Sequence, residues 1–244
     1  MVRCCLAYAV VVVCVSAVSD APAQAEPRAV IELFTSQGCS SCPAADKLLG
    51  ELADDPSLVA MSLPVDYWDY LGWHDTLALA GHSKRERAYA HVRGDGQVYT
   101  PQIVVNGNAH VLGSDKIAIE RAIAQDRKNG VRLSLPVTLA VAGDKVSVDV
   151  PAGKDGRGEV WLCPITKAVA VAIGRGENHG RTITYHNVVR RWLKLGDWAG
   201  AAQSFKLPLH DIQTGDIDSA AVVVQSGNAG NPGPMIGATI ASIH

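Results

Sequence analysis

Two patterns of apolar and polar residues divide the chain near Gly130. Before this residue, short and nearly continuous apolar runs alternate with segments whose apolar residues recur at helical spacing, which is typical of α/β layering. After it, apolar and polar residues alternate with a period of two and turn residues recur at short intervals, which favours an antiparallel sandwich. We therefore expect an α/β domain over residues 26–130 and a mainly antiparallel β-sandwich domain over residues 131–244.

The pattern of the first domain predicts the order strand, helix, strand, helix, strand, strand, helix. Asn106-Gly107 is a hairpin signal between the last two strands, and Gly130 ends the last helix. The expected strands are Val30–Phe34, Leu58–Val65, Gln102–Val105 and Ala109–Leu112, and the expected helices are Pro43–Ala53, Ser83–Val92 and Lys116–Lys128. The first of these strands is apolar at almost every position, so we expect it to be covered on both faces.

The second domain is predicted to consist of short strands joined by turns such as Gly143-Asp144. The expected strands are Leu133–Val137, Val146–Val150, Glu159–Cys163, Ala168–Ile173, Thr182–Leu193, Ser204–Leu207, Ala220–Gln225 and Ile236–Ile243. No low-complexity linker separates the two domains, so we expect them to pack against each other. Residues 131–244 show no pattern of catalytic residues.

The first 25 residues have the pattern of a secretory signal peptide. Arg3 supplies a positive charge, an apolar stretch covers Cys4–Val18, and Ala23-Gln24-Ala25 fits the small-x-small rule for cleavage. The apolar stretch is shorter than the roughly 20 residues that cross a bilayer, so no membrane span is expected after cleavage. We predict cleavage after Ala25, with Ala23 as the alternative, and a periplasmic or secreted protein.

Cleavage leaves three of the six cysteines, which are Cys39, Cys42 and Cys163. One close pair and one further cysteine do not make a framework of several disulfides, so we expect the pair to have a chemical function. Cys163 lies in a strand pattern and is expected to be a small buried hydrophobe. The net charge is −2 and no basic stripe is present, which argues against nucleic acid or an anionic membrane as a partner.

The segment Cys39-Ser40-Ser41-Cys42 lies between a predicted strand and a predicted helix. Free backbone N–H groups and the positive end of the helix dipole at such a junction favour a thiolate over a thiol. Cys39 is therefore a candidate nucleophile that attacks a disulfide sulfur, and Cys42 is a candidate for resolving the mixed disulfide. A static disulfide, a zinc site completed by His74 or His110, and a copper site remain as alternatives.

Four features of the sequence together resemble the thioredoxin superfamily. They are the first expected strand, the Cys39–Cys42 segment, the helix that starts at Pro43, and the dipeptide Thr100-Pro101 ahead of a hairpin strand. The wider segment Glu32–Pro43, together with Tyr67–Trp73, is similar to a particular group of exported bacterial thioredoxin-like proteins of unknown function, whose second half is rich in β-structure. The resemblance implies a thioredoxin-like first domain in which Cys39 attacks and Cys42 resolves.

The resemblance also implies roles for residues outside the cysteine pair. Pro101 matches the proline that follows a cis peptide bond and faces the pair, where the backbone around Thr100 would bind a substrate backbone. Gly38 stands where thioredoxins have a tryptophan, so the substrate surface must be built from other residues. Glu32 matches the buried carboxylate that serves as a proton shuttle, or else it is a buried acid satisfied by hydrogen bonds. Independently of the resemblance, Trp68 follows a strand of the α/β layer, where ligands gather beyond the carboxyl ends of the strands, and is a candidate substrate platform.

Trp73 is a second candidate for the substrate platform. For both tryptophans, the alternative is that they cover the core or fill the seam between the domains. Taken together, the sequence predicts a periplasmic or secreted thiol–disulfide oxidoreductase that acts on protein disulfides and on a redox partner. It would need no organic cofactor and no metal. The alternative is a non-catalytic secreted protein in which both domains form a binding surface and the cysteine pair has no catalytic part.

Overall fold

The computed structural model describes residues 27–154 and 156–243, so the signal peptide expected over residues 1–25 lies outside the described residues. Within the described residues, no helix is long and apolar enough to cross a membrane. The elements are, in chain order, β1 (Ala29–Thr35), α1 (Pro43–Ala53), β2 (Leu58–Pro64), the 3-10 helix η1 (Asp69–Leu71), α2 (Ala80–Arg93), β3 (Gln102–Val105), β4 (Ala109–Leu112), α3 (Lys116–Lys128), β5 (Thr138–Ala142), β6 (Lys145–Val150), β7 (Gly158–Ala172), β8 (Thr182–Val189), β9 (Leu193–Trp198), β10 (Gln203–Pro208), α4 (Leu209–Ile212), β11 (Ser219–Asn228) and β12 (Asn231–Ser242).

The elements expected before residue 130 are all present, and α1, β3, β4 and α3 have the expected bounds. The second helix differs, because α2 begins at Ala80 rather than at Ser83. Its first turn has no apolar periodicity, but His82 is fully buried and its Nδ1 lies 2.9 Å from the carbonyl oxygen of Pro64. A polar residue that packs inward hides the start of this helix from a hydrophobicity pattern.

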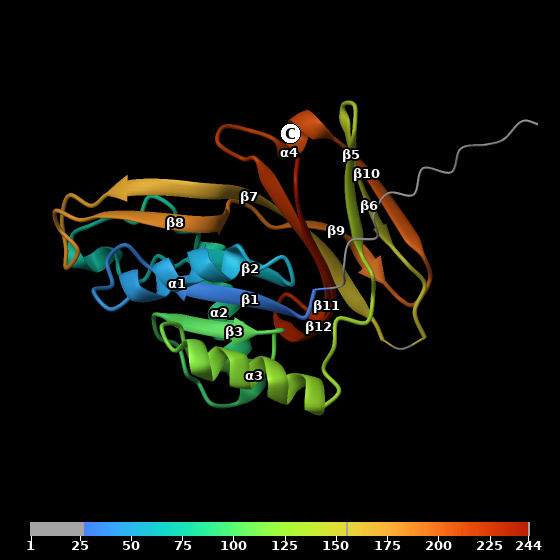
Figure 1. Cartoon of the computed structure of the whole chain (residues 1–244), viewed down its shortest axis with the longest axis horizontal. Helices are drawn as coiled ribbons and strands as arrows, with labels where there is room; N and C mark the ends of the chain where they lie inside the picture. Colours follow the sequence, from blue (N-terminus) through green and yellow to red (C-terminus); the bar gives the residue numbers. More distant parts are fainter. Residues whose placement is uncertain (1–26, 155, 244) are drawn as a thin grey trace, which may run out of the picture.

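One mixed sheet runs through both halves of the chain (Figure 1). Its main strand order is β12, β11, β7, β8, β2, β1, β3, β4, and β9 pairs with β7. β1 and β2 are parallel, as their helical connection requires, whereas β3 and β4 form an antiparallel hairpin. The strands after residue 130 join those before it where Val188 of β8 pairs with Ser62 of β2. The boundary expected at residue 130 therefore separates segments that contribute strands to the same sheet.

Three expectations for the second half are wrong in their strand boundaries. Residues Leu133–Val137 form no strand, and only Leu135 makes an isolated bridge, to Gly237. β7 is one strand of 15 residues, where two strands were expected on either side of Pro164. Proline cannot donate a ladder hydrogen bond, but the partner strand changes at this point. β9 pairs with Gly158–Leu162 and β8 with Ile165–Ala172, so no ladder bond is needed from Pro164 on that side. Conversely, β8 and β9 are separate strands, where Thr182–Leu193 was expected as one.

Helices α1 and α3 cover one face of β1, β2 and β3 (Figure 1). The side chains of β1 alternate accordingly, since Ile31 and Leu33 pack with these helices whereas Val30 and Phe34 belong to the core on the other face. That second core includes Tyr89 of α2 and residues of β7, β11 and β12. Both faces of β1 are therefore covered, as its apolar run predicts.

A second sheet, with strand order β10, β6, β5, packs against the large sheet. Val146, Val148 and Val150 of β6 are buried in the same cluster as Val160 of β7 and Val222 of β11. The residues between these valines are half-buried or exposed, so the alternation with a period of two is confirmed here. The molecule is thus a mixed α/β protein with a β-rich second half, built on one large mixed sheet and one small sheet.

A buried ion pair connects the two halves beneath the second core. Glu32 of β1 is fully buried, and its carboxylate accepts hydrogen bonds from Arg85 Nε and from the Tyr89 hydroxyl, each at 2.6 Å. Arg85 Nη2 also donates to the side chain of Gln225 in β11, at 2.8 Å. Each buried charge lies beside an opposite charge, which is the condition under which a buried ion pair is tolerated.

We predict that Glu32→Gln lowers the free energy of unfolding by about 3–5 kcal/mol, because it leaves the buried Arg85 guanidinium without its charged partner. Urea unfolding followed by circular dichroism measures this change. The control is Glu120→Gln, which removes an ion pair with Arg28 that is partly exposed and should cost about 1 kcal/mol or less. Equal urea midpoints for the two variants would contradict the assigned importance of the buried pair.

Candidate functional site

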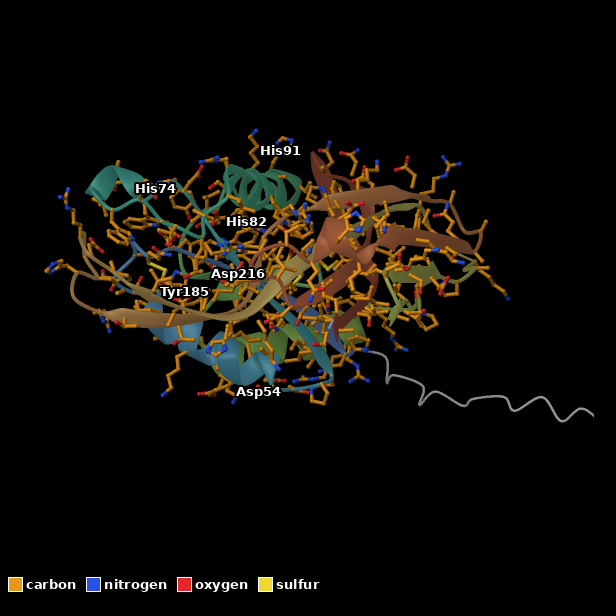
Figure 2. All side chains as sticks on the ribbon, turned by 90° about the horizontal axis from the view of Figure 1, so that it is seen from above. Asp54, His74, His82, His91, Tyr185 and Asp216 are labelled. Atoms are coloured by element: carbon orange, nitrogen blue, oxygen red, sulfur yellow. A yellow bond between two sulfur atoms is a disulfide. The ribbon has the colours of Figure 1, made fainter. Side chains whose placement is uncertain are left out.

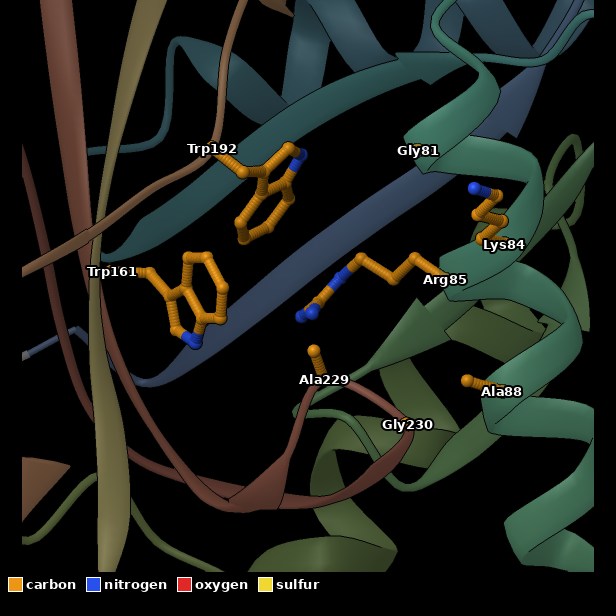
Figure 3. A pocket seen from close by; sticks show the side chains of 8 residues that line it. All are labelled: Gly81, Lys84, Arg85, Ala88, Trp161, Trp192, Ala229 and Gly230. Carbon is orange, nitrogen blue, oxygen red and sulfur yellow. The ribbon is translucent and has the colours of Figure 1, made fainter.

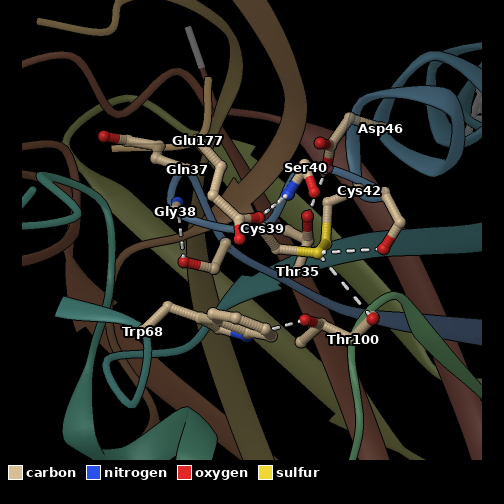
Figure 4. Close-up of a disulfide and its surroundings, with 12 residues drawn as sticks. Thr35, Gln37, Gly38, Cys39, Ser40, Cys42, Asp46, Trp68, Thr100 and Glu177 are labelled. Atoms are coloured by element: carbon tan, nitrogen blue, oxygen red, sulfur yellow. Dashed lines mark hydrogen bonds between the residues drawn. A yellow bond between two sulfur atoms is a disulfide. The ribbon is translucent and has the colours of Figure 1, made fainter. Parts of the chain in front are cut away.

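Cys39 and Cys42 form a disulfide between the end of β1 and the start of α1 (Figure 4). Their Cα atoms are 5.4 Å apart, which is an ordinary separation for a disulfide. Pro43 occupies the first position of α1, where a missing N–H is no loss and the fixed φ favours the helix. The helix axis therefore directs its positive end at the cysteine pair.

The peptide bond between Thr100 and Pro101 is cis, as the resemblance implied. Cys39 Sγ lies 3.7 Å from the carbonyl oxygen of Thr100, to which a reduced Cys39 thiol can donate. It also lies 3.3 Å from the hydroxyl of Ser41, which can donate to the sulfur. The loop before β3 and the cysteine pair therefore meet at the sulfur of Cys39 (Figure 4).

Trp68 takes up the space beside the pair. Its indole Nε1 donates to the hydroxyl of Thr100 at 2.8 Å, and its ring stacks on Tyr70, which is 78% exposed. A Cβ added to Gly38 would lie only 3.0 Å from Trp68 Cβ. The absence of a side chain at position 38 is therefore explained, since Trp68 packs directly against Gly38.

The loop 173–181, which joins β7 to β8, holds the backbone of the cysteine loop. Asn178 is fully buried, and its Nδ2 donates to the carbonyl oxygens of Gln37 at 2.9 Å and of Cys39 at 2.8 Å. The Glu177 carboxylate accepts from the backbone N–H of Ser40 at 3.1 Å (Figure 4). Hydrogen bonding to the side chain and to the backbone of Ser40 lowers the pKa of Glu177. Residues more than 130 positions away along the chain thus belong to the site.

Trp73 fixes the same loop from the other side. Its Nε1 donates to the side-chain oxygen of Gln37 at 2.8 Å, and a Cβ added to Gly174 would lie 3.0 Å from its ring. Trp73 therefore packs in the seam between the first half of the chain and loop 173–181, which is the packing alternative expected for it. Trp68 and Trp73 both lie at the site, but Trp73 contacts the loop that carries Cys39 rather than Cys39 itself.

The sulfur of Cys39 is not openly accessible. Cys39 is 1% exposed and Cys42 is fully buried, whereas Ser40 and Ser41 are exposed. The segments that surround Cys39 explain this burial. Thr100 and Trp68 meet on one side of Cys39, and Asn178 holds the backbone on the other. A protein substrate can reach the sulfur only if part of this cover moves.

Asp46 is a buried acid that the sequence analysis missed. It lies one helical turn after Cys42 on α1, and the hydroxyl of Thr35 donates to its Oδ1 at 2.8 Å. Burial raises the pKa of Asp46 to about 8, and the negative charge of Asp75 also raises it. Tyr185 lies on β8 and is labelled in Figure 2. Burial and the charges of Asp46 and Asp75 raise its pKa.

Glu32, which the resemblance matched to a proton shuttle, has a different environment. Both of its carboxylate oxygens accept hydrogen bonds, and it lies with α2 rather than with α1, which carries Cys42. This is the expected alternative of a buried acid satisfied by hydrogen bonds. Asp46 differs because its Oδ2 has no hydrogen-bond partner among the described residues.

The remaining titratable candidates form no metal centre. Among the described residues, no group of three or more histidine, cysteine, aspartate or glutamate side chains is placed to hold a metal ion. His74 pairs with Asp69 at 2.6 Å, and His110 pairs with Asp95 at 3.2 Å. Cys163 is buried, as expected, and burial raises the pKa of its thiol well above its usual range.

Comparison with known proteins gives the following findings. A family described as "Protein of unknown function (DUF1223)" matches residues 30–225. Protein AGR_C_4864 from Agrobacterium tumefaciens is 35% identical, with a TM-score of 0.80 over 89% of this chain and 95% of that chain. HBP35 of Porphyromonas gingivalis is 16% identical, with a TM-score of 0.59 over 89% of this chain and 76% of that chain, which is a likeness of fold alone. No curated protein matches the chain.

We predict that Glu177→Gln raises the alkylation rate of Cys39 in the reduced protein several-fold at neutral pH. The glutamine oxygen can still accept a hydrogen bond from the backbone of Ser40. The negative charge of the Glu177 carboxylate, which disfavours a Cys39 thiolate at the start of α1, is removed. The rate with iodoacetamide is measured in a Cys42→Ala, Cys163→Ala background, where Cys39 is the only remaining thiol among the described residues.

Glu51→Gln, an exposed change on α1 distant from the pair in sequence, serves as the control for the alkylation measurement and should leave the rate unchanged. High salt should reduce the effect of Glu177→Gln, because the exposed charge is screened. Identical rates for the Glu177 variant and its parent would contradict an electrostatic influence of this carboxylate on Cys39.

We also predict a pH-dependent stability that originates in Asp46. Between its unfolded pKa of 3.8 and its native pKa of about 8, Asp46 holds a proton only in the native state, so the free energy of unfolding falls as pH rises. Asp46→Asn removes this dependence. Urea unfolding at about pH 5, 6.5 and 8 should therefore show a smaller loss for the variant than for the parent. Asp54→Asn, an exposed control, should keep the parent's change of unfolding free energy with pH. The same change in all three proteins would refute the origin of this pH dependence in Asp46.

Proposed function

Because the chain belongs to the DUF1223 family of proteins of unknown function, whose description gives no activity, we propose a function from the site itself. The protein is an exported thiol–disulfide oxidoreductase with a thioredoxin-like first domain, and it acts on protein disulfides through Cys39 and Cys42. The observation that carries this proposal is the position of the cysteine pair at the start of α1, with the cis bond before Pro101 facing it across Cys39.

The positions of the residues support a division of roles in the exchange. In the reduced protein, the Cys39 thiolate attacks a substrate disulfide, forms a mixed disulfide and releases one substrate thiolate. The Cys42 thiol then loses its proton, attacks Cys39 Sγ and expels the second substrate thiolate. Two electrons pass to the substrate, and the Cys39–Cys42 disulfide is formed. The same steps in reverse oxidise a substrate dithiol.

Asp46 is the group best suited to accept the proton of Cys42. It is one helical turn away, its Oδ2 has no partner among the described residues, and its pKa of about 8 lies near neutrality. A general base is most effective when its pKa is close to the working pH. Glu32 is less suited, because Arg85 and Tyr89 occupy its carboxylate.

Substrate access is expected to require movement of Trp68 or of loop 173–181. The stacked rings of Trp68 and the exposed Tyr70 offer an apolar surface beside Thr100, where a substrate chain would lie. Loop 173–181 is attached by side-chain hydrogen bonds to the cysteine loop rather than by a strand ladder, so it can separate without breaking the sheet.

A non-catalytic binding protein is the second candidate, and the burial of Cys39 favours it. In that case, the disulfide would fix the start of α1 and the aromatic surface of Trp68 and Tyr70 would bind a partner. The two candidates differ in what they require from the cysteine pair. Only the first requires the sulfurs to exchange with another molecule.

We predict that Cys39→Ser abolishes disulfide reduction, because it removes the attacking sulfur. Cys42→Ala should instead trap a covalent mixed disulfide that dithiothreitol releases, since the resolving thiol is missing. The measurements are insulin reduction and nonreducing electrophoresis of the trapped species. Cys163→Ala is the control and should keep full activity, because this cysteine is buried in the core that includes residues of β7, β11 and β12. Partner binding that survives in a Cys39→Ser, Cys42→Ser variant, with no turnover in the parent, would support the binding candidate instead.

A further inference from the structure

A cavity of about 410 Å³ opens between α2 and the second half of the chain (Figure 3). Trp161 of β7 and Trp192, in the link between β8 and β9, form one wall, and Arg85 and Lys84 of α2 lie across from them. Its volume is within the range of about 300–1,000 Å³ that small-molecule sites occupy. None of the residues that line it contacts the disulfide described above.

The tryptophan wall gives the cavity a shape suited to a flat ring. The rings of Trp161 and Trp192 meet edge to face, with centroids 6.2 Å apart and planes at 76°. On the α2 side, Gly81 has nothing within 4 Å of the place where a Cβ would stand. A planar aromatic ring can therefore meet one indole face and the edge of the other, an arrangement that aromatic groups prefer.

The charges around the cavity favour an anion. Arg85 stacks on Trp192 at 4.2 Å and uses Nε for Glu32 and Nη2 for Tyr89 and Gln225, which leaves Nη1 without a hydrogen bond among the described residues. Lys84 is exposed and has no ion pair in the described part of the chain. The lining contains no aspartate or glutamate. The Glu32 charge is matched by Arg85, so Lys84 gives the opening an excess positive charge.

We propose that this cavity binds a small planar aromatic carboxylate. The ring lies against Trp161 and Trp192, and the carboxylate accepts a hydrogen bond from Arg85 Nη1, while the charge of Lys84 at the opening attracts the anion. A charge-assisted bond to a partly buried guanidinium fixes the orientation of the ligand, while the aromatic wall supplies most of the buried apolar area. The site is independent of the proposed redox function, because it uses none of the residues that carry the exchange.

Isothermal titration calorimetry of the oxidised protein with 2-naphthoate tests this proposal, with neutral 2-naphthamide as the matched ligand. We expect one naphthoate per chain and an affinity for the amide that is weaker by about tenfold or more, the loss that corresponds to a missing charge-assisted hydrogen bond. Trp192→Leu should weaken naphthoate binding by a similar factor, because it removes part of the aromatic wall and the ring on which Arg85 stacks.

Lys84→Gln should weaken naphthoate binding at low salt, and the difference should shrink at high salt. Lys128→Gln on α3 makes the same charge change at an exposed position outside the cavity and should leave the affinity unchanged. Urea unfolding confirms that each variant is folded, and Trp161→Leu replaces Trp192→Leu if the latter is not.

Three outcomes overturn the proposal. They are the absence of binding heat at millimolar naphthoate, equal affinities for naphthoate and naphthamide, and unchanged affinity in the folded tryptophan variant. A Cys39→Ser, Cys42→Ser variant should bind naphthoate as the parent does. The result is therefore separate from the outcome of the disulfide exchange experiments.

Discussion

The arrangement of the site depends on one constraint, which is that the buried backbone groups of the cysteine loop must find hydrogen-bond partners. The side chain of Asn178 donates to the carbonyl oxygens of Gln37 and Cys39, and the Cys39 carbonyl also accepts from the backbone N–H of Cys42. A buried carbonyl without a partner costs free energy comparable to a lost hydrogen bond. The pairing therefore fixes loop 173–181 over the disulfide and also makes Cys39 inaccessible.

Two buried carboxylates, Glu32 and Asp46, show how the environment of an acid sets its charge state. Glu32 meets a guanidinium and a hydroxyl, so its charge is matched and it links β1 to α2 and β11. Asp46 has one hydroxyl partner and no cation bonded to it among the described residues, and burial raises its pKa to about 8. The same residue chemistry thus yields a fixed ion pair in one place and a titratable acid beside Cys42 in the other.

The sequence was informative where a local signal was strong. Residues close together in the sequence predict three elements, which are confirmed. These local signals are the apolar run of β1, the helical spacing after Pro43 and the Asn106-Gly107 turn. The cis bond before Pro101 came from the resemblance and not from spacing. The strand that continues through Pro164 could not be predicted, because it depends on the change of partner strand from β9 to β8 at this residue, which no local sequence pattern contains.

Three residues of the site could not be identified from the sequence, because local patterns carry little or no information about long-range contacts. They are Asn178, Glu177 and Asp46. The first two reach the cysteine loop only because β8 joins β2 in one sheet, and a long-range pairing leaves no trace in periodicity. Asp46 does carry a weak signal, since a charged residue at i+4 from Cys42 stands on the side of α1 that holds Leu49 and Ala45 in the core. An acid on a buried helix face deserves weight as a chemical candidate.

The central claim is that the Cys39–Cys42 disulfide exchanges with external thiols in the folded protein, despite its cover. Equilibration of the native protein in glutathione redox buffers, with the fraction oxidised determined by alkylation and mass spectrometry, tests this most directly. The account predicts a reversible two-electron transition between the disulfide and the dithiol, with native circular dichroism throughout. A pair that stays oxidised in every buffer until the protein unfolds would contradict it and would make the disulfide a purely structural bond.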